Sequence, residues 1–374
     1  MPLSWLEIDR TRLLSNVSAF RALGQGRALM TVVKANAYGH GLSAVAPLLA
    51  PATDWFGVNS LEEALSLSQL GIERPILIMG HTPSAEAETL VRGGFRQVVY
   101  RLDALAALAA AAQKTALAAR IHLKIETGTH RQGVALSELP SFASALAGMP
   151  GLAVEGAYTH FANIEDTLDP SYAQLQLARF REALDLLSGL GVRPSLLHAA
   201  ATAGAILYPE THFNLLRVGI GAYGIWPSRE TRLAARERGR SISLAPVLNW
   251  KSRLVQVKTV AAGGFVGYGL TFQANRPMRL GVVPVGYYDG YDRRLSNSGR
   301  ALVGGKPAPV VGRVAMNMMA LDVTDTEARE DDEVVLLGRQ GASEITAEEL
   351  AEKVGTIPYE ILSRINPLLP RSLV

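Results

Sequence analysis

The sequence predicts an α/β fold: a (β/α)8 barrel of the TIM type, followed by a second, mainly β C-terminal domain. From about residue 29 to residue 221, short apolar runs alternate with longer helix-like stretches, which is typical of repeated βα units. Eight such runs occur, as many as a closed barrel needs. Beyond about residue 228 this alternation stops, and short strands bounded by Gly and Pro replace it.

The opening segment, Leu3–Ile8, alternates like a strand but precedes the first barrel strand. We therefore expect residues 1–10 to form an N-terminal strand that pairs with the C-terminal domain. Residues 11–235 are expected to form the barrel and residues 236–374 the β-domain. The texture of the sequence changes within the polar, Arg-rich segment Ser228–Ser241.

The expected barrel strands are the short apolar runs of this alternation. They are Met30–Val33, Trp55–Val58, Pro75–Met79, Gln97–Tyr100, Ile121–Ile125, Ala153–Tyr158, Ser195–His198 and Asn214–Val218.

The stretches between these strands are predicted to be helices, among them Leu61–Leu70 and Tyr172–Leu187. The Ala-rich run Leu102–Ala119 resembles low complexity, but Ala is the best helix former, so it is predicted as a barrel helix. In the C-terminal domain the predicted strands include Leu254–Val257, Arg279–Val285 and Val334–Leu337.

The amino-acid composition excludes several classes of partner and of catalytic site. Of 374 residues, 48% are hydrophobic and 19% charged, the balance of a packed globule. The net charge is only +3 and basic residues are dispersed, so no nucleic-acid partner is expected. Without cysteine, any nucleophile must be Lys, Ser, Thr, Tyr or a carboxylate, and thiolate metal sites are excluded; we expect no metal. No leader or spanning segment is apparent, which predicts a cytoplasmic protein with no membrane partner.

A TIM-type barrel carries its functional groups just after the C-terminal ends of the strands. Lys34 follows the first expected strand directly, in the segment Lys34-Ala-Asn-Ala-Tyr38-Gly-His-Gly41, and is one of only seven lysines. A strand-end lysine is usually solvated. A lysine desolvated at a barrel mouth instead has a lowered pKa and can attack an aldehyde, which is the chemistry of pyridoxal phosphate (PLP).

PLP also needs an anion site, which barrels commonly build from the loops after strands seven and eight. Thr202-Ala-Gly204 and Gly219-Ile-Gly221 occupy those places, although such glycines more often mark only a turn. Arg217 ends the eighth expected strand and is either a surface ion pair or a donor to the cofactor ring. A guanidinium there would keep the pyridine nitrogen unprotonated and disfavour transamination.

The segment VKANAYGHG at residues 33–41 closely resembles the PLP-lysine signature of the alanine racemases. Other stretches match that family in order along nearly the whole chain: THFA at 159–162, RVGI at 217–220, AYG at 222–224, VGYGLT at 266–271, VGYYDGY at 285–291, GRVAM at 312–316 and PYE at 358–360.

The resemblance implies interconversion of L-alanine and D-alanine by two bases, Lys34 and the partner subunit's Tyr268, in a homodimer with shared active sites. Two opposed bases are needed because a single base would return its proton to the same face. The remaining implied roles fall into groups. His160 stacks on the ring and bonds Arg217, Arg131 bonds the ring hydroxyl, and Tyr38, Thr202, Gly219, Ile220 and Tyr359 surround the phosphate.

The substrate side of the implied site is formed by Arg131 and Met316, with Tyr287, Arg293 and Arg313 lining the entrance. Lys124 matches a lysine that some members carry in carbamylated form. Without the motif, His160, Met316 and Tyr359 would be read as core residues and Tyr268 as a turn aromatic.

The chain departs from the family pattern at several positions: Asn317 replaces Asp, Glu126 replaces Asp, Thr129 replaces Met, Val218 replaces Pro, and Ala201-Thr202 replaces Asn-Ser. Thr202 keeps a hydroxyl for the phosphate. Loss of a carboxylate at Asn317 alters the charge beside the substrate wall. A serine or broad-specificity racemase of the same family is therefore the main alternative.

Two other function classes fit less well. A PLP decarboxylase of similar plan uses a cysteine from its second domain, and this chain has none. A PLP carrier protein built on the barrel alone would have no use for the residues that follow the barrel.

Overall fold

The computed structural model describes residues 2–374 and divides into two compact units. The barrel unit comprises residues 14–35 and 45–245, and the β unit comprises residues 2–13, 36–44 and 246–374. Residues 36–44, which the sequence would place in the barrel, therefore belong to the β unit. No helix among the described residues combines the length and apolar character needed to cross a bilayer.

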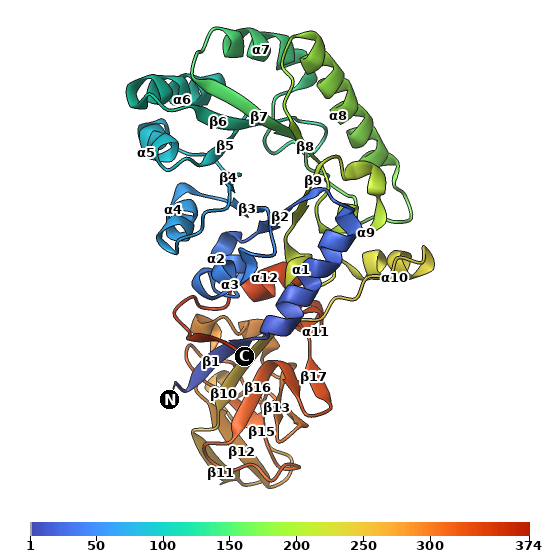
Figure 1. The fold of residues 1–374 in the computed structure, drawn as a ribbon. Helices are drawn as coiled ribbons and strands as arrows, with labels where there is room; N and C mark the ends of the chain where they lie inside the picture. Colours follow the sequence, from blue (N-terminus) through green and yellow to red (C-terminus); the bar gives the residue numbers. More distant parts are fainter. Residues whose placement is uncertain (1) are drawn as a thin grey trace. The chain divides into compact units, whose positions relative to one another are not determined.

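The barrel unit contains eight parallel strands, which confirms the predicted fold class (Figure 1). They are β2 (Ala28–Val32), β3 (Trp55–Val58), β4 (Ile76–Ile78), β5 (Arg96–Val99), β6 (Ala119–Lys124), β7 (Leu152–Tyr158), β8 (Leu196–His198) and β9 (Leu215–Val218).

The strands pair in sequence order from β2 to β8, and β9 pairs with β2. Between β8 and β9 the ring is held by isolated backbone bonds, from Asn214 N to Leu197 O and from Arg217 N to Ala200 O. One side-chain cluster packs among the strands; it consists of Met30, Trp55, Leu77, Val98, Tyr158 and Leu215.

Helices follow the strands and lie outside them in Figure 1. They are α4 (Leu61–Gln69), α5 (Ala87–Arg92), α6 (Leu102–Thr115), α7 (Leu139–Ala147), α8 (Ser171–Gly189), α9 (Thr202–Leu207) and α10 (Arg229–Glu237). Helix α6 ends four residues earlier than predicted, because Ala116 turns into the left-handed region with φ of 55° and β6 already begins at Ala119. Three further helices, α1 (Arg10–Gly24), α2 (Lys34–Tyr38) and α3 (Leu42–Leu49), cross the boundaries between the units.

The β unit holds two sheets and two helices. Its larger sheet runs in the order β14, β13, β16, β10, β1, β18, with β17 paired to β16, and the smaller runs β11, β12, β15. The bounds are β1 (Ser4–Ile8), β10 (Leu248–Arg253), β11 (Gln256–Val260), β12 (Met278–Val283), β13 (Arg300–Val303), β14 (Lys306–Pro309), β15 (Met319–Asp322), β16 (Glu333–Gln340), β17 (Ser343–Ile345), β18 (Arg371–Leu373), α11 (Ala347–Val354) and α12 (Pro358–Ser363).

Strand β1 lies between β10 and β18, antiparallel to the first and parallel to the second. The strand predicted at residues 254–257 is wrong in position. Its second half, residues 256–257, begins β11, but residues 254–255 form the break between β10 and β11, where the Leu254 side chain is buried and its backbone N–H donates to the carbonyl oxygen of Asp332. A buried apolar residue in a short break between two strands gives the same local pattern as a strand.

Candidate active site

Four cationic side chains follow strands of the barrel unit: Lys34 after β2, Lys124 at the end of β6, Arg131 in the next loop, and Arg217 in β9. Their charges act on one another, since the pKa of Lys124 is lowered by burial and by the charges of Arg131, Arg217 and Lys34. Such a cluster is unfavourable unless an anion neutralises it. The barrel unit is therefore suited to bind a negatively charged ligand here.

Lys34 is half-buried at the point where β2 ends. Burial lowers the pKa of its ammonium, the Arg131 charge lowers it further, and Glu63 partly offsets both. Glu63 also accepts a 2.6 Å hydrogen bond from the backbone N–H of Ala35, which fixes the residue next to Lys34. A lysine with a lowered pKa supplies more neutral amine near neutral pH, as a nucleophile requires.

The residues after Lys34 form one turn of left-handed helix. Ala35, Asn36, Ala37 and Tyr38 have φ between 53° and 54°. Left-handed residues other than Gly cost about 1–2 kcal/mol each. Such strain concentrates at functional sites, where the surrounding structure holds it in place.

Within the β unit, Gly39 ends this turn with φ of 83°. A Cβ there would lie 1.9 Å from the carbonyl oxygen of Leu362 in α12, so only Gly fits. Asn36 accepts a 2.8 Å hydrogen bond from Leu42 N, and Arg371 Nε donates 3.0 Å to Gly39 O. The close approach of Leu362 explains why the motif has Gly at position 39.

Arg217 is buried, with 3% of its surface exposed. Its Nη1 donates 2.8 Å to His198 Nδ1, and its Nη2 donates to the carbonyls of Thr159 (2.9 Å) and Ala199 (3.0 Å). His160 Nδ1 lies 3.4 Å from the same Nη2. No carboxylate between residues 2 and 374 pairs with Arg217, so the surface ion pair considered from sequence is not formed. Burial lowers the pKa of Arg217 to about 10, which leaves it charged at neutral pH.

Burial, Arg217 and other nearby cations lower the pKa of His160 to about 3, so this ring is neutral near pH 7. Lys124 donates 3.2 Å from Nζ to Gln132 and lies 5.6 Å from the centre of the Tyr158 ring. Burial, followed by the charges around it, lowers the pKa of Lys124 to about 8. A substantial fraction of its amine is therefore neutral under mildly basic conditions.

The two glycine-containing loops do come together. Thr202 begins α9 and its hydroxyl accepts a 3.3 Å hydrogen bond from Gly221 N. Gly219 and Ile220 precede that residue, at the start of a short 3-10 turn. The loops after β8 and β9 thus bring a hydroxyl and backbone N–H groups to one place in the barrel unit.

The remaining predicted residues lie in the β unit. Tyr268 is 74% exposed and occupies a turn between Gly267 and Gly269. Arg313 lies against Gly269, and Tyr287 N donates to Ala315 O, next to the exposed Met316. The rings of Tyr38 and Tyr359 have their centres 6.2 Å apart. Arg293 is exposed in the turn Arg293–Leu295.

Comparison with known proteins identifies the family. Family models for the N-terminal and C-terminal domains of alanine racemase match residues 8–227 and 247–373. A curated alanine racemase of Syntrophobacter fumaroxidans is 44% identical over 367 residues, which are 97% of this chain and 95% of that protein. The chain belongs to the alanine racemase family.

Solved alanine racemases have the same fold. The enzyme of D-cycloserine-producing Streptomyces lavendulae matches with a TM-score of 0.93 and 35% identity, over 100% of this chain and 98% of that one. The Bacillus anthracis enzyme with bound L-Ala-P matches with a TM-score of 0.94 and 32% identity, over 100% and 95%. The resemblance read from the sequence and the enzyme class, an isomerase of the racemase type, are confirmed.

Sequence reasoning on the alanine racemase motifs missed a second set of buried polar residues in the barrel unit. His122 Nδ1 lies 2.9 Å from His198 Nε2, and His122 also faces Glu155, which pairs with Arg96. In the sequence, His198 marks only the end of an expected strand and the start of the polar segment that follows it. The usable signal is a polar residue between apolar neighbours in each of two expected strands, His122 between Ile121 and Leu123, and Glu155 between Val154 and Gly156.

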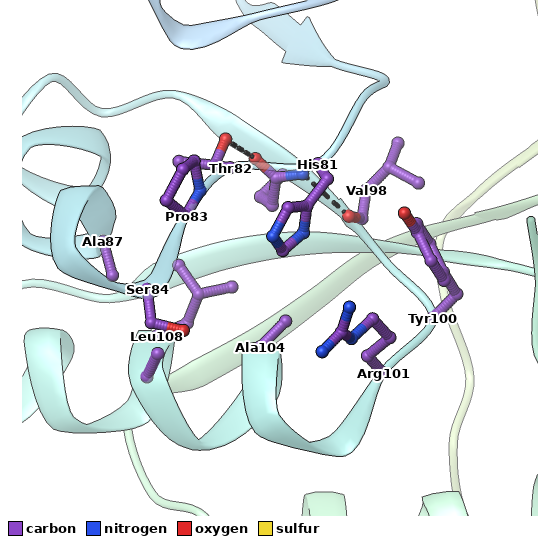
Figure 2. A pocket seen from close by; sticks show the side chains of 12 residues that line it. His81, Thr82, Pro83, Ser84, Ala87, Val98, Tyr100, Arg101, Ala104 and Leu108 are labelled. Carbon is purple, nitrogen blue, oxygen red and sulfur yellow. Dashed lines mark hydrogen bonds between the residues drawn. The ribbon is translucent and has the colours of Figure 1, made fainter.

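A small pocket between β4, β5 and α6 contains none of the residues predicted from the alanine racemase motifs (Figure 2). Gln97, one of its lining residues, accepts a 2.7 Å hydrogen bond from the Thr82 hydroxyl and donates 2.8 Å to the carbonyl of Val98. Tyr100 on its wall accepts a 3.1 Å hydrogen bond from Gln132, the partner of Lys124. The pocket therefore borders a hydrogen-bonded chain that ends at the cationic cluster.

Proposed function

We propose that this protein racemises alanine with PLP held on Lys34. The observation that carries the proposal is a strand-end lysine with a lowered pKa, set among other cationic side chains in the barrel unit. When bound, PLP supplies an aldehyde for the lysine amine and an electron-accepting ring that makes the α-proton of the amino acid removable. The names of the curated relatives favour alanine over serine or a broader set of substrates.

The chain's residues fit such a cofactor. Arg217 is a permanent donor without a carboxylate partner, and it faces the pyridine nitrogen in this proposal. A donor that cannot give up its proton keeps that nitrogen unprotonated. His160 packs on the ring and Arg131 bonds the ring hydroxyl. Thr202, Gly219, Ile220, Tyr38 and Tyr359 hold the phosphate.

Proton transfer is divided between two residues on opposite faces of the substrate. Lys34 Nζ holds or releases the proton on one face, and the phenolic oxygen of the partner subunit's Tyr268 does so on the other. Removal on one face and delivery on the other inverts the α-carbon. The high exposure of Tyr268 in a single chain supports a role toward a second chain in a homodimer.

Selection of alanine falls to side chains that limit the space for its methyl group. Met316 and Tyr359 crowd a larger side chain, and Arg131 binds the substrate. Tyr287, Arg293 and Arg313 line the entrance.

A cytoplasmic location also stays a prediction.

Lys124 is the residue proposed to carry a carbamate. Its lowered pKa, about 8, makes the neutral amine available to carbon dioxide, and a carbamate would pair with Arg131. With 13C-labelled bicarbonate, the holoenzyme should show a carbamate carbon signal that is absent in Lys124→Arg. A signal that persists in Lys124→Arg would assign the modification elsewhere.

The function is tested by following the optical rotation of single L-amino acids with the purified chain and PLP. L-Alanine should lose its rotation and reach an equal mixture of enantiomers. A chain that binds PLP but leaves L-alanine unchanged while racemising serine would replace alanine by the alternative substrate.

A further inference from the structure

Five polar side chains form a column through the barrel unit, from the partly buried pair Arg96 and Glu155 to the buried His122, His198 and Arg217. Arg96 Nε contacts Glu155 at 2.9 Å, and a Glu155 oxygen lies 3.8 Å from His122 Nε2. His122 Nδ1 is 2.9 Å from His198 Nε2, and His198 Nδ1 is 2.8 Å from Arg217 Nη1. The two histidine side chains are fully buried, so their hydrogen bonds are not exchanged with solvent.

Arg217 sets the direction of the two hydrogen bonds made by the His198 ring. A guanidinium can only donate, so His198 Nδ1 must accept and its proton must sit on Nε2. That Nε2–H then donates to His122 Nδ1, which places the His122 proton on Nε2 as well. His122 Nε2 makes no hydrogen bond within residues 2–374, and the charged group it faces is the Glu155 carboxylate.

The barrel makes specific room for His122. The pairing of β6 with β7 shifts register between Ile121 and His122, which sets His122 opposite Gly156. A Cβ on Gly156 would lie 2.3 Å from His122 Nδ1, so only Gly admits the ring. The Trp55 ring meets the His122 ring at 5.6 Å, edge to face.

Charge is distributed unevenly along the column. Burial lowers the pKa of both His122 and His198, and Arg217 lowers that of His198 further, so both rings stay neutral. Burial would raise the pKa of Glu155, but His122 and Arg96 outweigh it and lower the pKa to about 2. Glu155, which is paired with Arg96, is thus ionised on one side of the two neutral rings, and Arg217 is charged on the other side.

We propose that Glu155 is a positioning residue for Arg217, acting through His122 and His198. Its carboxylate keeps the proton of both rings on Nε2, so that His198 Nδ1 always presents an acceptor to the guanidinium. If both rings took the opposite tautomer, an N–H of His198 would face an N–H of Arg217 and that bond would be lost. The consequence for catalysis rests on the proposed function; the tautomers themselves do not.

The test compares Glu155→Leu with Glu155→Gln in the full chain, with and without PLP. Both variants remove the ion pair to Arg96, but only Gln keeps a polar oxygen that faces His122 Nε2. Ring nitrogens are observed by NMR after 15N-histidine labelling, with His122→Gln and His198→Gln used to assign the signals. Racemisation kinetics are measured on the same preparations.

In the wild type, both rings should be neutral with the proton on Nε2 at pH 7.5. Glu155→Leu should add Nδ1–H signals and lower kcat about tenfold while KM changes less than about twofold, as expected for a residue that acts through a network. Glu155→Gln should restore most of the Nε2–H form of the rings and most of the wild-type kcat. If Glu155→Leu does not fold, His122→Leu against His122→Gln makes the same comparison, because Gln can both accept from His198 and donate to Glu155.

A charged ring or an Nδ1–H proton in the wild type would overturn the proposal. So would a single Nε2–H form with unchanged kcat in Glu155→Leu, or equal losses in the Leu and Gln variants. The predicted tautomers without any racemisation of alanine would instead reject the proposed function and leave the positioning of Arg217 intact.

Discussion

Arg217 in β9 donates a 2.8 Å hydrogen bond to His198 in β8, the two strands between which the barrel ring closes. The Nη2 group of the guanidinium donates to the backbone carbonyls of Thr159 and Ala199 and lies 3.4 Å from His160 Nδ1. This arrangement holds a buried charge by neutral acceptors alone. Its charge therefore remains available to a ligand in the barrel unit.

Reversing the charge at this position tests its role. Arg217→Glu should slow racemisation at least about 100-fold, the size of losing one preorganised donor in an active site. It should also change the absorption spectrum of the bound cofactor. Arg232→Glu, an exposed position in α10, is the matched control and should leave both unchanged. Unaltered rate and spectrum in Arg217→Glu would mean that this side chain does not touch the ring.

Lys34 should be the residue that captures PLP. Borohydride reduction of the holoenzyme followed by peptide mapping should place the adduct on Lys34 and on none of the other six lysines. Since the pKa of Lys34 is lowered, capture of PLP should rise with pH through a midpoint below the ordinary 10.5. Lys34→Ala should give no adduct and Lys258→Ala a normal one. A labelled peptide from elsewhere would refute the assignment.

Substrate size should be controlled at Met316. Alanine should have the highest kcat/KM of the single amino acids, and Met316→Ala should raise the ratio for larger side chains relative to alanine by about 10-fold or more, the effect of added room in a pocket. Met318→Ala is a close control, since Met316 and Met318 are 55% and 53% exposed. Better turnover of lysine or arginine by the unmodified enzyme would contradict this pocket.

Active sites shared between subunits predict complementation. Lys34→Ala and Tyr268→Phe should each be nearly inactive, but refolding an equal mixture makes about half of the dimers mixed. Each mixed dimer has one site with both residues intact, so activity should return to about a quarter of the wild type. If heterodimers form and no activity returns, both residues come from the same chain.

The left-handed turn predicts opposite effects of the same substitution at two places. Ala35→Gly should stabilise the protein by about 0.5 kcal/mol, because Gly relieves the positive φ while it loosens the unfolded chain. Ala110→Gly, exposed in the right-handed helix α6, should destabilise it by about 1 kcal/mol. Urea unfolding of both variants measures the difference. A loss of stability at Ala35→Gly would show that the turn is not strained.

The barrel strands could be predicted from the sequence because each of them is a short apolar run followed by a helix-like stretch. Apolar runs such as residues 55–58 and 215–218 lie where β3 and β9 form, and the motif around Lys34 pointed to the correct family. The prediction is wrong at Leu254, which lies in the break between β10 and β11 and is buried like a strand residue. Local pattern reports burial, and burial has more than one cause.

The sequence by itself determined the repeated βα pattern, the family and the residue types available for chemistry. Tertiary structure alone decided that residues 36–44 join the β unit, that four residues after Lys34 turn left-handed, and that Arg217 reaches Glu155 through two histidines. These features depend on contacts between residues that are separated in the chain. Arg371 bonds Gly39 after the left-handed turn, and the register shift between β6 and β7 sets His122 opposite Gly156. No local pattern encodes them, because a hydrogen-bond direction is fixed only when donor and acceptor meet in space.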